Sequence, residues 1–198
     1  MKFRTMMRAI SFFLVLILLC FISFAQEKYV VSAKSNIKVT GTSTLHDWEV
    51  LSNEISGSLL FELKDKGKKN QPLKGSIASA ELSLKVESLK SERGETMNGK
   101  MHRALLYDEF PQIKFSLTEA IPVNEASTIA KGVLAIAGTE KSVQIGVDLD
   151  VSEDTILIQG SKNFKLSDFE IDPPSAMFGQ IETGNDIVIS FDLKYTKE

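Results

Sequence analysis

The residues best suited to chemistry lie together in one short stretch, Gly41–Glu49. It contains the single tryptophan of the chain and one of its two histidines, His46, which is followed directly by Asp47. Ser43 and Thr44 add hydroxyl groups, so the stretch holds each residue type of a nucleophile–histidine–acid triad. The flanking residues alternate apolar and polar, as in a strand, and successive strand side chains point to opposite faces. His46 and Asp47 would then diverge, so we predict no catalytic residues and no enzymatic activity.

A metal site would need more ligands than the histidines can supply. His46 and His102 are the only imidazoles, and they meet only if the segment around His102 folds over the strand end. Two ligands are too few for a zinc or other transition-metal site. We therefore predict no metal and no cofactor. One alternative stays open, a quinone-associated redox or stress protein in which both histidines approach one ligand.

The first 25 residues have the pattern of a secretory signal peptide. Basic residues precede the apolar run Ile10–Phe24, and small residues precede Gln26 as they do at a cleavage site. The run is shorter than the roughly 20 residues that cross a bilayer as a helix. We predict a signal peptide at 1–25, one domain at 26–198, no stable membrane anchor after cleavage, and a periplasmic or secreted location.

Composition narrows the class of partner. The chain has 198 residues, a formal net charge of −3 and no basic run, which disfavours nucleic acid as a partner. Apolar residues make up 43% of the chain and include 12 phenylalanines, enough for a sizeable core. One folded domain after the leader fits this length.

Strand patterns dominate the chain after the leader. Period-two alternation of apolar and polar residues runs through Asn36–Thr40, Ser58–Leu63, Ser76–Glu87, Gln112–Leu117, Ser142–Ser152 and Asp186–Tyr195. Such alternation gives each strand one wet face and one dry face, which is typical of antiparallel sheet. Gly138–Lys141 separates two apolar runs and predicts a hairpin turn. We therefore predict an all-β fold of about eight antiparallel strands, as a sandwich or a barrel.

One segment, Ser91–Leu106, lacks this alternation. Met97, Met101 and Leu105 are spaced to form one stripe on a helix, although two glycines weaken it. We expect a short, irregular helix that closes one end of the β structure. Its methionines suit two roles, which both remain open: a plug of ordinary core, or a lid that contacts ligands of different shape.

Small side chains on the dry faces suggest room inside the fold. Ala78 and Ala80 are expected to point inward from one strand, and Ala135 and Ala137 repeat the pattern. An eight-stranded barrel is just wide enough to be filled by side chains or to hold one small ligand. The alanines favour a ligand. The phenylalanines keep the alternative open, a structural or interaction barrel with a filled core and no ligand.

Several stretches together resemble one known family. They are Ser43–Glu49, Lys100–Phe115, Gly132–Gly138, Phe164–Ile171 and the closing strand Asp186–Tyr195, in the expected order along the chain. The chain is thereby similar to the YceI-like family, secreted bacterial proteins with a lipocalin-like antiparallel barrel and a short helical crossing segment. The resemblance implies a lumen that holds an amphiphile with a long apolar tail, such as a polyisoprenoid, an isoprenoid quinone or a fatty acid derivative.

These arguments define the expected site and partners. We predict that the ligand-binding side chains, in the lumen or at its mouth, are His46, Trp48, Ala80, Leu82, Leu84, Met97, Met101, Leu105, Phe110, Phe115, Ile145, Val147, Ile189 and Phe191. The expected partner is a long-chain apolar or amphiphilic lipid, since each buried methylene contributes roughly 0.8 kcal/mol. A homodimer is a candidate oligomeric state.

Overall fold

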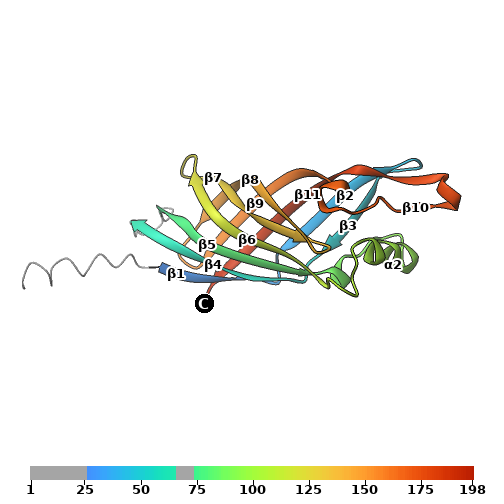
Figure 1. Cartoon of the computed structure of the whole chain (residues 1–198). Coiled ribbons are helices and arrows are strands. Elements are labelled where there is room, and N and C mark those ends of the chain that lie inside the picture. The colour runs from blue at the N-terminus through green and yellow to red at the C-terminus, as the bar shows by residue number, and fades with distance from the viewer. Residues whose placement is uncertain (1–25, 66–73) are drawn as a thin grey trace, which may run out of the picture.

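The computed structural model describes residues 26–65 and 74–198, and the predicted signal peptide lies outside them. Antiparallel strands form an elongated barrel with one short α-helix at an end (Figure 1). The strands are β1 (Gln26–Val31), β2 (Asn36–Ser43), β3 (Trp48–Ser52), β4 (Ile55–Asp65), β5 (Lys74–Lys85), β6 (Gln112–Pro122), β7 (Ser127–Ile136), β8 (Thr139–Val151), β9 (Thr155–Lys165), β10 (Ser175–Ala176) and β11 (Ile181–Lys197). The helical elements are η1 (Val86–Ser88), α2 (Glu95–Ala104), η2 (Leu166–Phe169) and η3 (Met177–Gly179).

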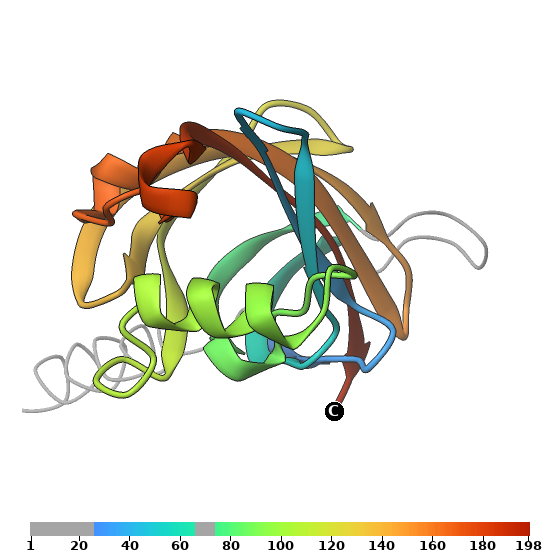
Figure 2. The same cartoon turned by 90° about the vertical axis from the view of Figure 1, so that its right-hand side faces the viewer.

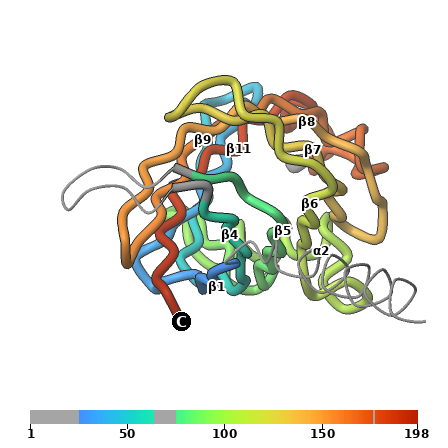
Figure 3. The backbone as a smooth tube through the Cα atoms, turned by 90° about the vertical axis from the view of Figure 1, so that its left-hand side faces the viewer, coloured from blue at the N-terminus to red at the C-terminus, as the bar shows by residue number. Residues whose placement is uncertain are grey.

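Eight of the strands close into a ring. Their order is β1-β4-β5-β6-β7-β8-β9-β11, and β11 pairs back onto β1 with Val31 opposite Tyr195. Figure 3 shows this ring from the end opposite α2. The predicted all-β, eight-stranded antiparallel barrel with a helical crossing segment is therefore confirmed.

The long strand β11 organises the closure. One of its edges pairs with β9, and the other pairs first with β2 and then with β1. The strands β1 and β2 thus lie end to end along the same edge of β11. The β2–β3 hairpin extends the wall past the ring, and β3 meets the segment after β5 through a bridge between Leu51 and Lys90.

Helix α2 lies across the end of the barrel that the β2–β3 hairpin extends (Figure 2). It begins after Gly94, whose φ of 86° lies in the left-handed region that favours glycine. The buried Asn98 fixes the start of the helix, because its Oδ1 accepts the Ser91 backbone N–H at 2.8 Å. This confirms the predicted helix within Ser91–Leu106.

At the mouth, β8 and β9 separate. Their pairing extends from Val151 opposite Ile156 only to Val147 opposite Gly160. The η2 turn contacts both strands beyond this point. Lys141 of β8 forms an ion pair with Asp168 of η2, and the hydrogen bond from Lys141 holds the pKa of the Asp168 carboxyl below its usual value. This ion pair therefore ties η2 to the wall of the barrel.

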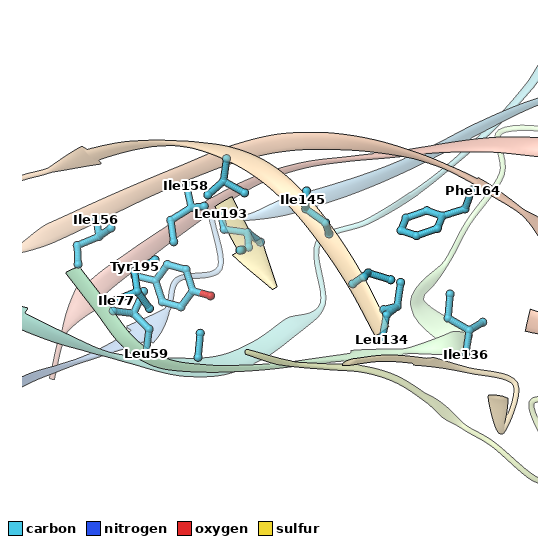
Figure 4. Packing of buried hydrophobic residues seen from close by; sticks show 14 of the residues in the cluster. Leu59, Ile77, Leu134, Ile136, Ile145, Ile156, Ile158, Phe164, Leu193 and Tyr195 are labelled. Atoms are coloured by element: carbon cyan, nitrogen blue, oxygen red, sulfur yellow. The ribbon is translucent and has the colours of Figure 1, made fainter. Parts of the chain in front are cut away.

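The end of the barrel away from α2 is closed by packed side chains. Tyr29, Leu59, Phe61, Ile156 and Tyr195 are all at most 1% exposed there. Figure 4 shows Leu59, Ile156 and Tyr195 together at this end. The Tyr29 hydroxyl lies 3.1 Å from a Glu27 carboxylate oxygen and 3.2 Å from the Glu153 carbonyl. This end thus forms a floor beneath the lumen.

A bulge in β5 changes one expected side-chain direction. Leu60 pairs with Ser79, whereas the next residue, Phe61, pairs with Ile77, so Ala78 is an extra residue on β5. Ile77 is buried and Ala78 is exposed. The expectation that Ala78 points inward was wrong because an extra residue shifts a period-two pattern by one position.

The β7–β8 turn lies earlier than Gly138–Lys141. Ile136 pairs with Thr139, so Ala137 and Gly138 form a two-residue turn. Both have positive φ, 49° and 82°, as the type I′ turn of a tight hairpin requires. Ala137 therefore lies in a turn, and Ala135 alternates with two residues that line the lumen, so neither supplies the inward small side chain that the sequence suggested.

Candidate functional site: an apolar lumen beneath a helix

An outer cavity of about 110 Å³ lies between α2 and the barrel mouth. The helix contributes Met97 and Met101 of the predicted stripe, together with Lys100 and Ala104, and Leu105 of the stripe follows directly after the helix. The facing walls include Trp48 and Val50 of β3, Ile187 and Ile189 of β11, and Leu166 and Phe169 of η2. The helix is thus a roof over an open space, and its methionines face that space.

A larger cavity of about 150 Å³ continues toward the floor of the barrel. Its walls come from strands around the ring and include Ala80, Phe115, Ala130, Ile145, Phe191 and Tyr195. Val39, Leu89, Ile113, Ile136 and Ile189 line both cavities, so the two adjoin along the barrel. A space of this size is far larger than one water molecule requires. The phenylalanines therefore do not fill the barrel.

Most of the predicted contact residues surround these cavities. Those at the outer cavity are Trp48, Met97, Met101, Leu105 and Ile189. Those at the inner cavity are Ala80, Leu82, Leu84, Phe115, Ile145, Val147, Ile189 and Phe191. His46 and Phe110 line neither cavity. Contact of these side chains with a ligand stays a prediction.

His46 lies in the β2–β3 turn and not on a strand. It is exposed, and its Nδ1 lies 3.0 Å from the Asp47 carbonyl oxygen. His102 lies on α2, where its Nε2 is 3.2 Å from the Leu89 carbonyl oxygen. The expectation that His46 lies on a strand was wrong because the chain reverses between β2 and β3. Within residues 26–65 and 74–198, no three His, Cys, Asp or Glu side chains are grouped to hold a metal ion.

Trp48 begins β3 immediately after this turn. Its indole N–H donates to the Thr42 carbonyl at 2.9 Å, and its ring covers Gly41, where an added Cβ would lie 2.3 Å from the ring. The ring lines the outer cavity on one side and a polar surface hollow on the other. Glycine at position 41 thus allows the indole to lie flat on β2 at the boundary between the two spaces.

Phe110 packs against the β7–β8 turn. A Cβ on Gly138 would lie 2.5 Å from the Phe110 ring, so this close approach requires a glycine. The side chain remains 38% exposed. Phe110 therefore covers the outside of a hairpin at the mouth, and its place there explains why it does not reach the lumen.

Sequence reasoning missed several lining residues. Tyr195 and Leu193 follow Phe191 with period two on a predicted strand, so the signal for them was present. Leu89 lies just after η1, where no periodic pattern indicates its direction. Lys162 also borders the inner cavity and pairs with the inward-facing Ile189, yet it is exposed. A lysine is seldom expected on a dry face, but here β8 and β9 have separated and its long side chain reaches solvent.

The rim of the mouth carries exposed apolar side chains on two connected loops. Leu45 lies in the β2–β3 turn and is 65% exposed, and Met177 and Phe178 lie between β10 and β11 and are also exposed. The Thr44 hydroxyl donates to the Gln180 carbonyl at 3.3 Å, which joins the two loops. Both Met177 and Phe178 have left-handed backbone conformations, which are unusual for large side chains.

A sequence model of the YceI-like domain matches residues 26–195 of this chain. The chain belongs to the YceI-like family. The match covers the ring from β1 to Tyr195 of β11 and includes the α2 crossing that roofs the lumen. A search of curated proteins finds no match.

Solved structures share the fold of this YceI-like barrel. A polyisoprenoid binding domain from Saccharophagus degradans matches with a TM-score of 0.66 and 12% identity, over 88% of this chain and 100% of that domain. Burkholderia cenocepacia BcnA matches with a TM-score of 0.63 and 18% identity, over 83% of this chain and 98% of its own. A Campylobacter jejuni YCEI protein matches with a TM-score of 0.53 and 16% identity, over 62% and 73%. At these identities the likeness concerns the fold.

None of the described helices is long and apolar enough to cross a membrane.

Proposed function

We propose that this YceI-like barrel binds a long-chain amphiphile, such as a polyisoprenoid, an isoprenoid quinone or a fatty acid derivative, and acts as a carrier without catalysing a reaction. The observation that carries the proposal is the pair of adjoining apolar cavities between α2 and the floor. A structural neighbour described as a polyisoprenoid binding domain supports the same ligand class. The leader-like residues 1–25 support a periplasmic or secreted location.

The walls of the lumen explain why a chain-like ligand would bind. They present almost only hydrocarbon, so affinity would come from removing methylene groups from water. At roughly 0.8 kcal/mol for each methylene, every added group strengthens binding about fourfold until the lumen is full. Such a site selects a ligand by length and width. The methionines of α2 can adapt to different chains because their side chains are unbranched.

The direct test is to purify the chain from Gln26 onward, extract it with organic solvent and identify lipids by mass spectrometry. We expect a long-chain amphiphile to co-purify or, from a delipidated sample, to bind when added. The proposal fails if nothing is extracted and no added isoprenoid or fatty acid binds.

A matched pair of variants separates lumen binding from adsorption to the surface. Ala130 lines the inner cavity, whereas Ala135 lies on the same strand, β7, outside both cavities. We expect Ala130→Phe to occupy lumen volume and weaken binding at least tenfold, while Ala135→Phe leaves binding unchanged. Equal affinities of the two variants for the same fatty acid, measured by calorimetry, would contradict lumen binding.

A further inference from the structure

Among the described residues that line the inner cavity, Tyr195 places a polar group, its hydroxyl, near the floor. The residue is 1% exposed, and it lines the inner cavity near the closed end of the barrel. Figure 4 shows its hydroxyl oxygen pointing away from Ile156 and along the lumen, toward the side of the barrel where Leu134 and Phe164 lie. The group is thus aimed into the space that a ligand would fill.

This hydroxyl hydrogen-bonds to no residue among those that the structure describes. Tyr29 lies at the same end of the barrel and differs in this respect, because its hydroxyl has both Glu27 and the Glu153 carbonyl within reach. Burial also raises the pKa of Tyr195, so the group stays a neutral O–H donor at physiological pH. Among the described residues no fully buried side-chain nitrogen or oxygen lacks a partner, so the Tyr195 hydroxyl is not sealed in the core but borders the space of the inner cavity, where a ligand atom can reach it.

We propose that Tyr195 donates a hydrogen bond to a neutral oxygen at the inner end of the ligand. The inference rests on the proposed function, since it requires a ligand in the lumen. It narrows the ligand to a long apolar molecule whose inner end carries a carbonyl or hydroxyl oxygen. A plain hydrocarbon end would leave the tyrosine hydroxyl unpaired, and an ionised end would bring a charge into an apolar cavity that offers it one donor.

Two kinds of molecule present such an oxygen, and separate probes distinguish them. A ligand that enters with its apolar tail first would carry this oxygen at the tip of the tail, opposite its polar end. Fatty acids with a terminal hydroxyl, from dodecanoic to octadecanoic acid, represent this kind, with the unmodified acids as controls. A ligand that enters with its polar end first is represented by methyl ketones of the same lengths, with the matching 1-alkenes as controls.

The test compares these probe pairs in wild type and Tyr195→Phe, which removes only the hydroxyl. At one or more chain lengths, we expect the oxygen-bearing probe to bind wild type about tenfold more tightly than its control, and Tyr195→Phe to abolish this preference. The infrared carbonyl stretch of a bound methyl ketone should shift to lower frequency in wild type and return in Tyr195→Phe if the polar end enters first. The variant Tyr29→Phe should keep the preference, because the Tyr29 hydroxyl already has partners within the protein.

The outcomes separate this inference from the proposed function. If probes bind but wild type and Tyr195→Phe show the same preference at every length, or wild type shows none, the role of Tyr195 is overturned and the carrier function stands. If no probe of any kind binds to wild type, the carrier function itself is overturned.

Discussion

Trp48 lies where the apolar lumen meets a polar hollow on the outer surface. It is the only tryptophan of the chain, so its emission reports one place. A ligand chain under α2 would displace water from the indole face, and we expect a shift of the emission to shorter wavelength on binding. The measurement is a titration of the delipidated protein with a fatty acid. An unchanged spectrum, with binding shown by calorimetry, would place the ligand away from Trp48.

The two buried tyrosines at the floor predict a loss of stability in alkali. Burial raises the pKa of Tyr29 to about 12 and raises that of Tyr195 as well, above the value near 10 of an unfolded chain. Between about pH 10 and pH 12 the unfolded chain has lost these protons while the folded chain keeps them, so the free energy of unfolding falls as pH rises. Urea unfolding followed by circular dichroism should show this fall.

The control for this prediction is the double variant Tyr29→Phe/Tyr195→Phe. It removes both phenols but keeps the lysines that also titrate in this range. A pH dependence as steep as that of wild type would assign the alkaline loss to other groups.

The sequence predicted residues of the site where they lie on regular strands. Ile145 and Val147, or Ile189 and Phe191, face the lumen because nothing interrupts their period-two pattern. The strand position expected for His46 was wrong because the residue lies in the turn between two strands. Side chains in a turn do not alternate between two faces as they do along a strand. The position of the Tyr195 hydroxyl in the cavity, without a hydrogen-bond partner among the described residues, could not be foreseen, because it depends on which side chains the other strands place around it.

At the scale of elements, α2 is the part of the barrel best placed to control access to the lumen. It is a ten-residue helix with a glycine in its interior, so its own stability is low. A Cβ added at Gly99 would contact only the Arg103 side chain, at 3.6 Å. We expect Gly99→Ala to stabilise the helix by about 1 kcal/mol and to slow ligand release. Stopped-flow displacement of a bound fatty acid measures the release rate.

The opposite change tests the same lid. Asn98→Ala leaves the Ser91 N–H without its acceptor and should loosen the start of α2, so that ligand release becomes faster. If both variants release ligand at the wild-type rate, opening of α2 does not limit release.

The sequence pattern located some elements and missed others for a physical reason. In β9, Ile156, Leu157 and Ile158 are consecutive apolar residues, and the next inward position is Gly160, against which the Phe191 ring packs. Because a glycine occupies this inward position, the strand has no apolar side chain there, and its period-two pattern is interrupted. The short β3 was also not predicted as a separate strand, because the turn that precedes it lies within Gly41–Glu49, which the alternation suggested was strand-like throughout.

At the scale of the whole molecule, the barrel is closed by one seam between its first and last strands. Val30 of β1 pairs with Thr196 of β11 across this seam. The ion pair of Lys28 with Glu198 beside it is exposed and contributes little, whereas the ion pair of Lys197 with Glu27 is partly buried. We expect a disulfide between Val30→Cys and Thr196→Cys to raise the free energy of unfolding by about 2–4 kcal/mol. Urea unfolding of the oxidised and reduced forms measures the gain.

The chain after the predicted leader contains no native cysteine, so no other disulfide competes. The reduced form of the same protein is the matched control. Equal stability of the two forms would show that the seam is not where the barrel opens.

The seam also sets the order of events during synthesis. The first strand of the ring leaves the ribosome long before its partner β11 exists, and β11 also supplies the edges for β2 and β9. Until β11 is made, the nascent chain is an open sheet with unpaired edges, and such edges attract other chains. A holding chaperone would therefore be needed until β11 is made, and a nonsense mutation within the codons of β11 should yield an aggregate in place of a shortened barrel.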